Sequence, residues 1–256
     1  MKTTLITLTA SLLLATAAQA STLIYSDTFD NDGLATNTGT GGGLVNNSIA
    51  GTKSWADDGN LQFVIGTGSQ YQQRAMAYSE NGFQSDDGFE LSVSYFYTSD
   101  GGDSQISFGL VSDDTNLSTY AGFSPYTEDT SVYSFGVNTE NKSLVFTNAS
   151  SASILDTDTG TLMDAGVGAF TVDMSITADG SGGADWSWSI GGVDQGSGNI
   201  AAFDFSKTFH FVAYGQDDQG NKGINSVSIS AIPEPSSYAL LAGILGLSYV
   251  MVRRRN

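Results

Sequence analysis

The amino-acid sequence predicts an all-β protein whose main domain is an antiparallel β-sandwich, preceded by a signal peptide and followed by one short transmembrane helix. The first observation is composition, because 22 of the 27 acidic residues are Asp and 31 of the 256 residues are Gly, and both are poor helix formers. The second is an alternation of apolar and polar residues that recurs with a period of two. The third is that turn-forming clusters, not helical segments, separate these stretches, which favours a sandwich over a parallel sheet with helical crossovers.

About eleven segments carry the strand pattern. Six show clear alternation over five or more residues: 89–97, 106–110, 133–137, 170–176, 186–190 and 209–213. Five are shorter: 23–25, 61–65, 74–78, 144–146 and 227–229. Clusters of Asp, Gly, Asn and Ser predict turns between them, for example at 86–88, 179–183 and 191–198. Residues 33–60 are rich in Gly, Thr and Asn, and they form either a long loop or an irregular strand.

The charge balance and the absence of Cys exclude several classes of function. The chain carries 27 acidic and 9 basic residues, a net charge of −18, and so lacks the basic face that nucleic-acid binding requires. It has no Cys, which excludes disulfides, thiolate metal sites and cysteine nucleophiles. With 40% apolar residues it can still bury a core, and we expect one domain over residues 21–232 with a net charge of about −21.

Residues 1–20 have the features of a secretory signal peptide. Lys2 supplies the charged start, residues 5–17 are apolar apart from Thr and Ser, and Ala18 and Ala20 place small side chains before a predicted cleavage at Ser21. The alternative is a short N-terminal membrane helix, but no strong flank would hold it in a bilayer. We therefore expect signal peptidase as a partner and an exported mature chain.

The C-terminal region carries three features in order. The motif Pro233-Glu234-Pro235 comes first, an apolar run of 15 residues follows over 238–252, and the block Arg253-Arg254-Arg255 comes next. As a helix the run would be about 22 Å long at about 1.5 Å per residue, which makes a marginal membrane span when the arginines snorkel. The basic block would stay cytoplasmic and leave the acidic domain outside. A buried core helix is the alternative, which the prolines and the abrupt basic block disfavour.

This C-terminal arrangement resembles a PEP-CTERM sorting signal. The resemblance covers about 25 residues: the sequence Ile-Pro-Glu-Pro-Ser-Ser, which begins at position 232, is followed by the apolar run and the basic block. The resemblance implies that residues 233–256 are a sorting signal, and that a membrane-embedded exosortase-type enzyme recognises Pro-Glu-Pro and processes the anchor. It also implies a Gram-negative bacterium that makes extracellular polysaccharide. The protein would pass through an inner-membrane intermediate to the cell surface or the extracellular matrix.

The central domain resembles, in architecture and spacing, the jelly roll of concanavalin A-like and laminin G-like proteins. It opens with a predicted strand that runs into an acidic turn at 25–30. It closes with a strand near 209–214, an Asp/Gly-rich loop at 217–223 and a final strand at 224–230. The resemblance implies that the first and last strands pair with each other.

The sequence points to no catalytic residue. A Ser-His-Asp hydrolase would have to use His210, the only His, which lies in a predicted strand, and no Gly-x-Ser-x-Gly elbow is present. One His and no Cys also leave zinc without its usual ligands. Jelly-roll glucanases carry paired acids on one strand, whereas Glu90 has no second acid on its strand face. We therefore expect a protein that is not an enzyme.

Calcium is the metal that the composition favours, because it takes oxygen ligands from Asp, Asn and carbonyl groups. Asp27 and Asp30 lie in the densest acidic cluster and Asp217 lies in a second, and pairing of the first and last strands would bring the two clusters together. Solvated turns are the alternative interpretation. Residues 156–160 begin like an EF-hand loop but lack its Gly and its last Glu, so we exclude them.

Carbohydrate binding would use aromatic side chains exposed in loops, beside amide and carboxylate groups. Trp55, Tyr120 and Tyr126 lie in such loop-like sequence and are the candidates for this role. Trp186 and Trp188, by contrast, share one strand face with an apolar neighbour and are expected in the core.

These features predict an exported β-sandwich of the cell surface or extracellular matrix, with a structural or carbohydrate-binding role. Extracellular polysaccharide would be its partner, and the C-terminal helix its contact with the membrane. The alternative is a carbohydrate-active enzyme of jelly-roll fold whose site the sequence patterns do not reveal.

Overall fold

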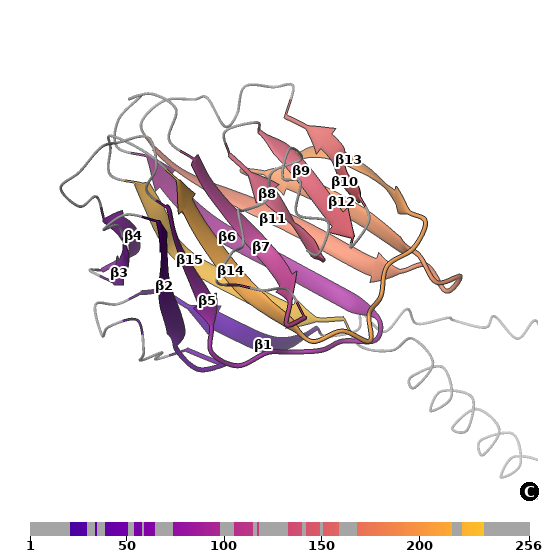
Figure 1. Cartoon of the computed structure of the whole chain (residues 1–256). Coiled ribbons are helices and arrows are strands. Elements are labelled where there is room, and N and C mark those ends of the chain that lie inside the picture. The colour runs from indigo at the N-terminus through magenta and orange to yellow at the C-terminus, as the bar shows by residue number, and fades with distance from the viewer. Residues whose placement is uncertain are drawn as a thin grey trace, which may run out of the picture. The chain divides into compact units, whose positions relative to one another are not determined.

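The computed structural model describes residues 21–29, 34, 39–50, 54–57, 59–64, 74–97, 105–114, 117, 133–139, 142–148, 151–158, 168–216 and 222–232. These residues form fifteen strands in two antiparallel sheets (Figure 1). The signal peptide and the sorting signal expected from the sequence lie outside them. None of the described residues belongs to a helix long and apolar enough to cross a membrane.

One layer, called sheet A, contains eight strands. They are β1 (Thr22–Asp27), β3 (Ser54–Asp57), β4 (Leu61–Val64), β6 (Gly88–Tyr97), β11 (Gly168–Ala178), β12 (Ala184–Ile190), β13 (Val193–Ile200) and β15 (Lys222–Ala231). Their order across the sheet is β13-β12-β11-β6-β15-β4-β3, and β1 pairs with β15 beside this path. The long strands β11, β6 and β15 therefore form the middle of the layer.

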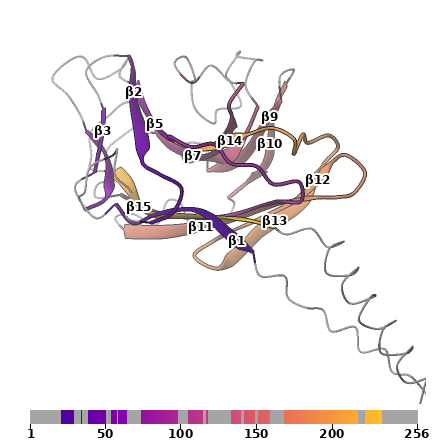
Figure 2. The same ribbon diagram turned by 90° about the horizontal axis from the view of Figure 1, so that it is seen from below.

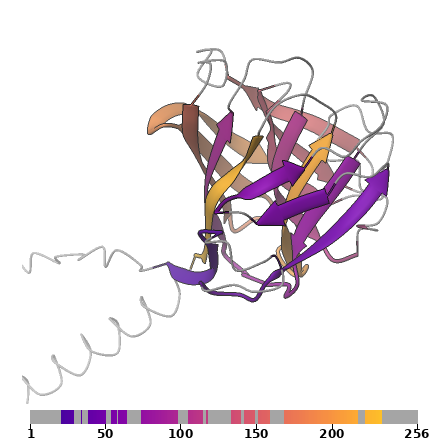
Figure 3. The same cartoon turned by 90° about the vertical axis from the view of Figure 1, so that its left-hand side faces the viewer.

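The other layer, called sheet B, contains seven strands. They are β2 (Leu44–Ala50), β5 (Arg74–Ser79), β7 (Gln105–Ser112), β8 (Ser134–Asn138), β9 (Ser143–Asn148), β10 (Ser151–Thr157) and β14 (Phe209–Gln216). Their order is β10-β9-β8-β7-β14-β5-β2. Figure 2 shows the two layers stacked. The two layers contact each other along two edges. At one edge β10 lies near β13, and at the other β3 lies near β2 and β5. The second edge faces the viewer in Figure 3.

The core lies between the sheets because alternate side chains of each strand point inward. On the central strand β6 the buried side chains are Phe89, Leu91, Val93 and Tyr95. Tyr95 packs its ring 5.6 Å from that of Phe108 on sheet B. Tyr25 of the first strand stacks on Phe211 of sheet B at 5.8 Å. Burial of each large apolar side chain contributes about 1.5–3 kcal/mol to stability.

The structure confirms the predicted strands and the predicted pairing of the chain ends. Each of the eleven alternating segments coincides with a strand. The first strand, β1, pairs with the last, β15, in antiparallel register, with Thr22 opposite Ala231 and Asp27 opposite Val227. Trp186 and Trp188 are buried, as expected from the strand face that they share.

Four strands lie outside the eleven predicted segments, although an irregular strand within 33–60 was one of the two alternatives for that segment. Two of them, β2 and β3, lie within the segment 33–60, and β10 lies in a polar stretch. The turn predicted over 191–198 is wrong, because only Gly191 and Gly192 form a turn and β13 begins at Val193. The alternation that marks the other strands is absent from β13, since Gly196 and Gly198 occupy two of its inward positions.

Those small residues make room for side chains of neighbouring strands. A Cβ on Gly198 would lie 2.7 Å from the ring of Trp186, and a Cβ on Gly196 would collide with the carboxylate of Asp156. Because Gly198 has no side chain, β13 can pair closely with β12 while the indole ring of Trp186 lies against Gly198. The strand is defined by its neighbours rather than by its own sequence.

One hydrogen bond joins the two sheets beside this strand. The indole Nε1 of Trp188, on β12 of sheet A, donates to Oδ2 of Asp156, on β10 of sheet B, over 2.8 Å. The Trp188 side chain is 2% exposed, so the bond is shielded from water on the indole side. A hydrogen bond to a charged group contributes more than one between neutral groups, and this bond joins β12 to the edge strand β10 of the other sheet.

Replacement of Trp188 by Phe should lower the free energy of unfolding by about 1.5–3 kcal/mol, because Asp156 loses its charged-group hydrogen bond. Chemical denaturation of Trp188→Phe, Asp156→Ala and the double variant gives the coupling energy of the pair. The matched control is Trp186→Phe, whose indole forms no such bond with Asp156, so its coupling with Asp156→Ala should be near zero. Equal coupling energies for the two tryptophans would contradict this role.

Candidate functional site

A hollow of about 620 Å³ lies on the outer face of sheet A, away from sheet B. Ten Ser, Asp and Glu side chains line it, two from each of five adjacent strands. Strand pairing arranges them in two rows that run across β15, β6, β11, β12 and β13. The first row contains Ser228, Ser92, Asp173, Ser189 and Asp194. The second row contains Ser230, Glu90, Ser175, Ser187 and Ser197.

The rows arise from the same alternation that builds the core. On β11, Asp173 and Ser175 alternate with the buried Met174 and its buried neighbours, and so they point to the outer face of sheet A. Because the strands pair in register, the polar positions of one strand lie directly opposite the polar positions of the next. A β-bulge in the pairing of β12 with β13, between Trp188 and Ser189, bends the edge of the sheet next to the rows.

Three carboxylates give the hollow its charge. Asp173 is held in place by two serines, because Ser92 Oγ donates to its Oδ1 at 2.6 Å and Ser189 Oγ donates to its Oδ2 at 3.4 Å. Glu90 and Asp194 are exposed. No described Lys, Arg or His lines the hollow or forms an ion pair with any of the three.

The chemistry that the hollow offers is hydrogen bonding over an extended surface. A Ser hydroxyl both donates and accepts, and an ionised carboxylate accepts at two oxygens. Ser187, Ser197, Ser228 and Ser230 form no side-chain hydrogen bond with another described residue, so their hydroxyls are available to a ligand or to water. Trp188 contributes to the hollow but its side chain is buried, so it offers no face for stacking.

The turn between β11 and β12 braces three of the strands that carry the rows. Asp179 Oδ1 accepts hydrogen bonds from the backbone N–H of Ser181 at 2.7 Å and of Gly183 at 3.0 Å. Asn199 of β13 donates to Asp179 at 3.1 Å and to Asp185 of β12 at 3.0 Å. The hydrogen bonds from Ser181 and Asn199 lower the pKa of Asp179 to about 2.

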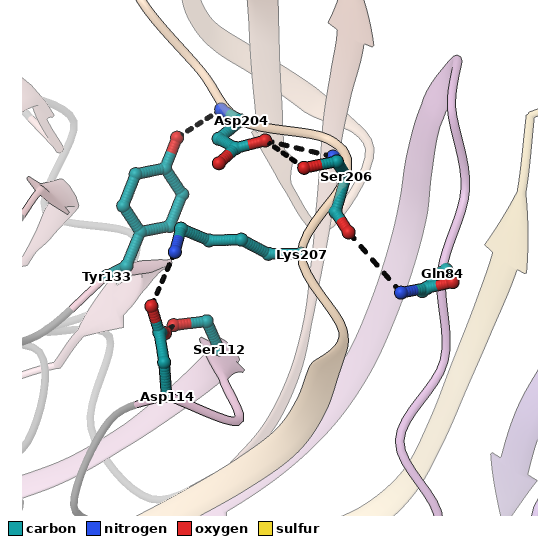
Figure 4. Close-up of polar contacts among 7 residues, drawn as sticks. All are labelled: Gln84, Ser112, Asp114, Tyr133, Asp204, Ser206 and Lys207. Carbon is teal, nitrogen blue, oxygen red and sulfur yellow. Dashed lines mark hydrogen bonds and ion pairs between the residues drawn. The ribbon is translucent and has the colours of Figure 1, made fainter.

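A second polar cluster ties loops together at one end of the sandwich (Figure 4). Lys207 forms an ion pair with Asp114, and its ammonium lies 5.2 Å from the ring centre of Tyr133. The Tyr133 hydroxyl accepts a hydrogen bond from the backbone N–H of Asp204, and Gln84 donates to the carbonyl of Ser206 at 3.3 Å. Each of the seven residues in this cluster contacts another of them, so we assign the cluster a structural role.

Two pKa shifts support this assignment. Partial burial pushes the pKa of Asp114 upward, but hydrogen bonds from Lys207 and Ser112 outweigh it and leave the pKa below its ordinary value. Burial raises the pKa of Tyr133 to about 12. Both shifts therefore come from the packing and the hydrogen bonds of the cluster itself.

Few of the site residues predicted from the sequence lie where the structure can test them. Asp27 is buried, and its Oδ1 accepts a hydrogen bond at 2.9 Å from the N–H of Phe29, which has a positive φ of 54°. Asp30 and Asp217 lie outside the described residues. Within the described ranges no three His, Cys, Asp or Glu side chains converge on a metal position. The described residues therefore supply no calcium site, and the calcium site stays a prediction.

Of the three aromatic candidates for carbohydrate binding, only Trp55 lies within the described residues. Trp55 belongs to β3 and not to a loop, and its backbone pairs with that of Phe63 in β4. Tyr120 and Tyr126 lie outside the described residues. His210 is half-buried, with Nδ1 2.7 Å from the carbonyl oxygen of Ser79, which fits the structural role that its strand position predicted.

The hollow itself was missed because its acids come from different strands. Glu90 has no second acid on its own strand, as expected, yet Asp173 and Asp194 join it from β11 and β13. A sequence signal exists in the repeated Ser at alternate positions of β6, β12 and β15. The pattern of one strand cannot reveal which strands become neighbours.

The shifted pKa of Asp179 predicts how the turn responds to acid. In the folded chain the pKa of the Asp179 carboxyl is lower than its ordinary value. The ionised carboxylate therefore stabilises the fold at pH values above the ordinary pKa, and this stabilisation is lost as the pH falls toward about 2. Asp179→Asn should therefore lower the melting temperature at neutral pH, and the difference should vanish near pH 2. An NMR titration of the Asp179 carboxyl checks the cause, because Ser181→Ala removes one donor and should raise the midpoint. An unchanged midpoint in that variant would contradict the assignment.

Comparisons with known proteins identify the fold. No family model matches the sequence, and no curated protein matches it. The carbohydrate recognition domain of Emp47p has a TM-score of 0.51 at 12% identity, over 83% of this chain and 98% of that domain. The metal-free form of lectin I-B4 from Griffonia simplicifolia has a TM-score of 0.50 at 15% identity, over 80% of this chain and 98% of the lectin. The chain therefore has the concanavalin A-like β-sandwich fold that these two lectin domains share, as the resemblance of its central domain implied.

Proposed function

We propose that the chain is a carbohydrate-binding β-sandwich that binds its ligand without chemical turnover. The observation that carries the proposal is the hollow on sheet A, with seven serines and three carboxylates in two rows. Sugars present many hydroxyl groups, each of which both donates and accepts hydrogen bonds, as Ser does. The fold, which is that of a protein described as a carbohydrate recognition domain, supports the same function.

The position of the hollow suits recognition. Its side chains project from paired strands rather than from loops, so little conformational entropy is lost when a ligand binds. Water that covers the serines is replaced by sugar hydroxyls of similar hydrogen-bonding capacity. The ligand would be held by many weak contacts spread over five strands.

The proposal includes delivery to the cell envelope. The predicted signal peptide would export the chain, and the PEP-CTERM-like segment would hold it in the inner membrane until an exosortase-type enzyme transfers it to the surface or the matrix. A carbohydrate-binding domain at this location would bind extracellular polysaccharide and contribute to the matrix structure.

A carbohydrate-active enzyme is the second candidate, and the three carboxylates of the hollow are the observation that favours it. Glycoside hydrolysis requires two carboxyl groups on opposite sides of the scissile bond. Asp173 is occupied by Ser92 and Ser189, which fixes it as a hydrogen-bond acceptor within the row. Analysis of the products of any ligand that binds will separate this candidate from the first.

Binding should be measurable with the purified chain and a panel of neutral, acidic and amino-group-bearing polysaccharides. We expect retention without product, and we expect Ser187→Ala with Ser197→Ala to weaken binding about thirtyfold, since two hydrogen bonds at about 1 kcal/mol each are lost. Affinity electrophoresis or calorimetry provides the measurement, with chromatography of the supernatant to detect products.

The matched control is Ser153→Ala, because Ser153 is an exposed serine on β10 of the other sheet. It should bind as the unmodified chain does. Product formation that is lost in Glu90→Gln or Asp173→Asn would establish the enzyme instead. If no polysaccharide is retained, carbohydrate binding is wrong and a purely structural role remains.

The sorting segment should be removed in the native host. Intact-mass analysis of the surface protein should show a chain that begins at Ser21 and ends near residues 233–237, because the prolines keep the motif extended for the processing enzyme. Glu234→Ala should block this processing while the chain still enters the membrane. A surface protein that retains its C-terminal residue, Asn256, would rule out the sorting proposal.

A further inference from the structure

The electrostatics of the hollow restrict which polysaccharide can occupy it. Asp173 is at the middle of the first row, Asp194 is at its β13 end, and Glu90 is beside the middle of the second row. No described basic side chain neutralises them. They are also too dispersed to bind a metal ion together. The whole chain has a net charge of −18, so the long-range field adds to the local one. An acidic polysaccharide would be repelled, and a neutral one would bring no positive charge to the three carboxylates.

The geometry of the rows restricts the shape of the ligand. Adjacent strands are about 4.8 Å apart, so five positions in a row extend over about 19 Å. The repeat is comparable with the length of one sugar unit in an extended chain. The second row lies about 7 Å from the first, because same-face positions on one strand are two residues apart. A linear polymer that crosses the strands would therefore meet one or two hydroxyl or carboxylate groups at each step.

We propose that the hollow binds a linear polysaccharide that carries free amino groups, laid across the five strands along the two rows. This inference rests on the proposed carbohydrate-binding function and names the ligand class of the same site. The protonated amines face Glu90, Asp173 and Asp194, and the sugar hydroxyls face the serines between them. The acids lie on β6, β11 and β13, so their charges are distributed along the ligand rather than concentrated at one sugar.

An ammonium group supplies what the hollow lacks. It donates up to three hydrogen bonds and carries the charge that a carboxylate requires for a charge-assisted bond. Each exposed ion pair contributes little by itself in physiological salt. Several pairs on one polymer act together, because once one amine is bound the next is held at high effective concentration. Longer oligomers should therefore bind disproportionately better than short ones.

The test compares oligosaccharides that differ only in their amino groups. The full chain, purified in mild detergent, is titrated with β-1,4-linked glucosamine oligomers, with the N-acetylated oligomers of the same length, with neutral glucan oligomers and with oligomers of a uronic acid. The titrations are carried out at mildly acidic pH, where the amines are protonated. An ionic strength of about 0.15 M limits the reach of the remaining surface charge to about 8 Å. We expect the glucosamine oligomers to bind at least tenfold more tightly than the acetylated ones and the uronic acid oligomers not to bind.

Two double variants separate the hollow from the net charge of the chain. Glu90→Gln with Asp194→Asn removes two exposed charges from the hollow and should reduce the affinity for the glucosamine oligomer to that for the acetylated one. Glu80→Gln with Asp86→Asn removes two exposed charges that do not line the hollow, and should leave the affinity within twofold. Melting curves confirm that both variants fold, since all four side chains lie at the surface.

The outcomes distinguish this inference from the proposal on which it rests. If acetylated or neutral oligomers bind as tightly as glucosamine oligomers, the amino-group inference is wrong and carbohydrate binding stands. If the control pair weakens binding as much as the hollow pair, the attraction is a property of the net charge, and the inference is again wrong. If no oligomer binds, both proposals are wrong.

Discussion

The constraint on which this structure depends is the two-sided character of a β-strand. Successive side chains point to opposite faces, so a strand that alternates apolar and polar residues builds two surfaces at once. On β6, the series from Phe89 to Tyr95 packs against sheet B, while Glu90 and Ser92 between them face outward. A shift of register by one residue would bury the carboxylate and expose the aromatic rings. The core therefore fixes the register, and the register places the rows.

The rigid edges of the sandwich complete the site. The hollow includes β13, an edge strand without an apolar pattern of its own, which stays in place through its neighbours. Trp186 lies across Gly198, Trp188 donates to Asp156 of the other sheet, and Asn199 donates to Asp179 in the turn before β12. These contacts hold the outer two positions of each row in line with the other three. Preorganisation of this kind lowers the entropic cost of binding an extended ligand.

The two polar clusters of the domain differ in what their charges do. At the loop cluster, Lys207 neutralises Asp114 and caps the ring of Tyr133, so the charges are satisfied within the protein. In the hollow, Glu90 and Asp194 face solvent with no described cation beside them. An ion pair that is complete stabilises loops, whereas an array of carboxylates without counterions attracts a cationic partner. The presence of Lys207 makes the loop cluster a structural contact, and the absence of a described basic residue leaves the hollow as a candidate binding surface.

The sequence by itself determined eleven of the fifteen described strands. Burial of one face requires an apolar residue at every second position, and that requirement is visible in segments such as 89–97 and 170–176. It also determined the burial of Trp186 and Trp188, whereas the pairing of the first and last strands was implied by the resemblance to concanavalin A-like proteins. Only the tertiary structure decided that β13 is a strand, since its Gly and Ser residues acquire their conformation from β12. Only the tertiary structure decided that Glu90, Asp173 and Asp194 share one hollow. Strand order in a sheet depends on contacts between segments far apart in the chain, and no local pattern of residues encodes those contacts.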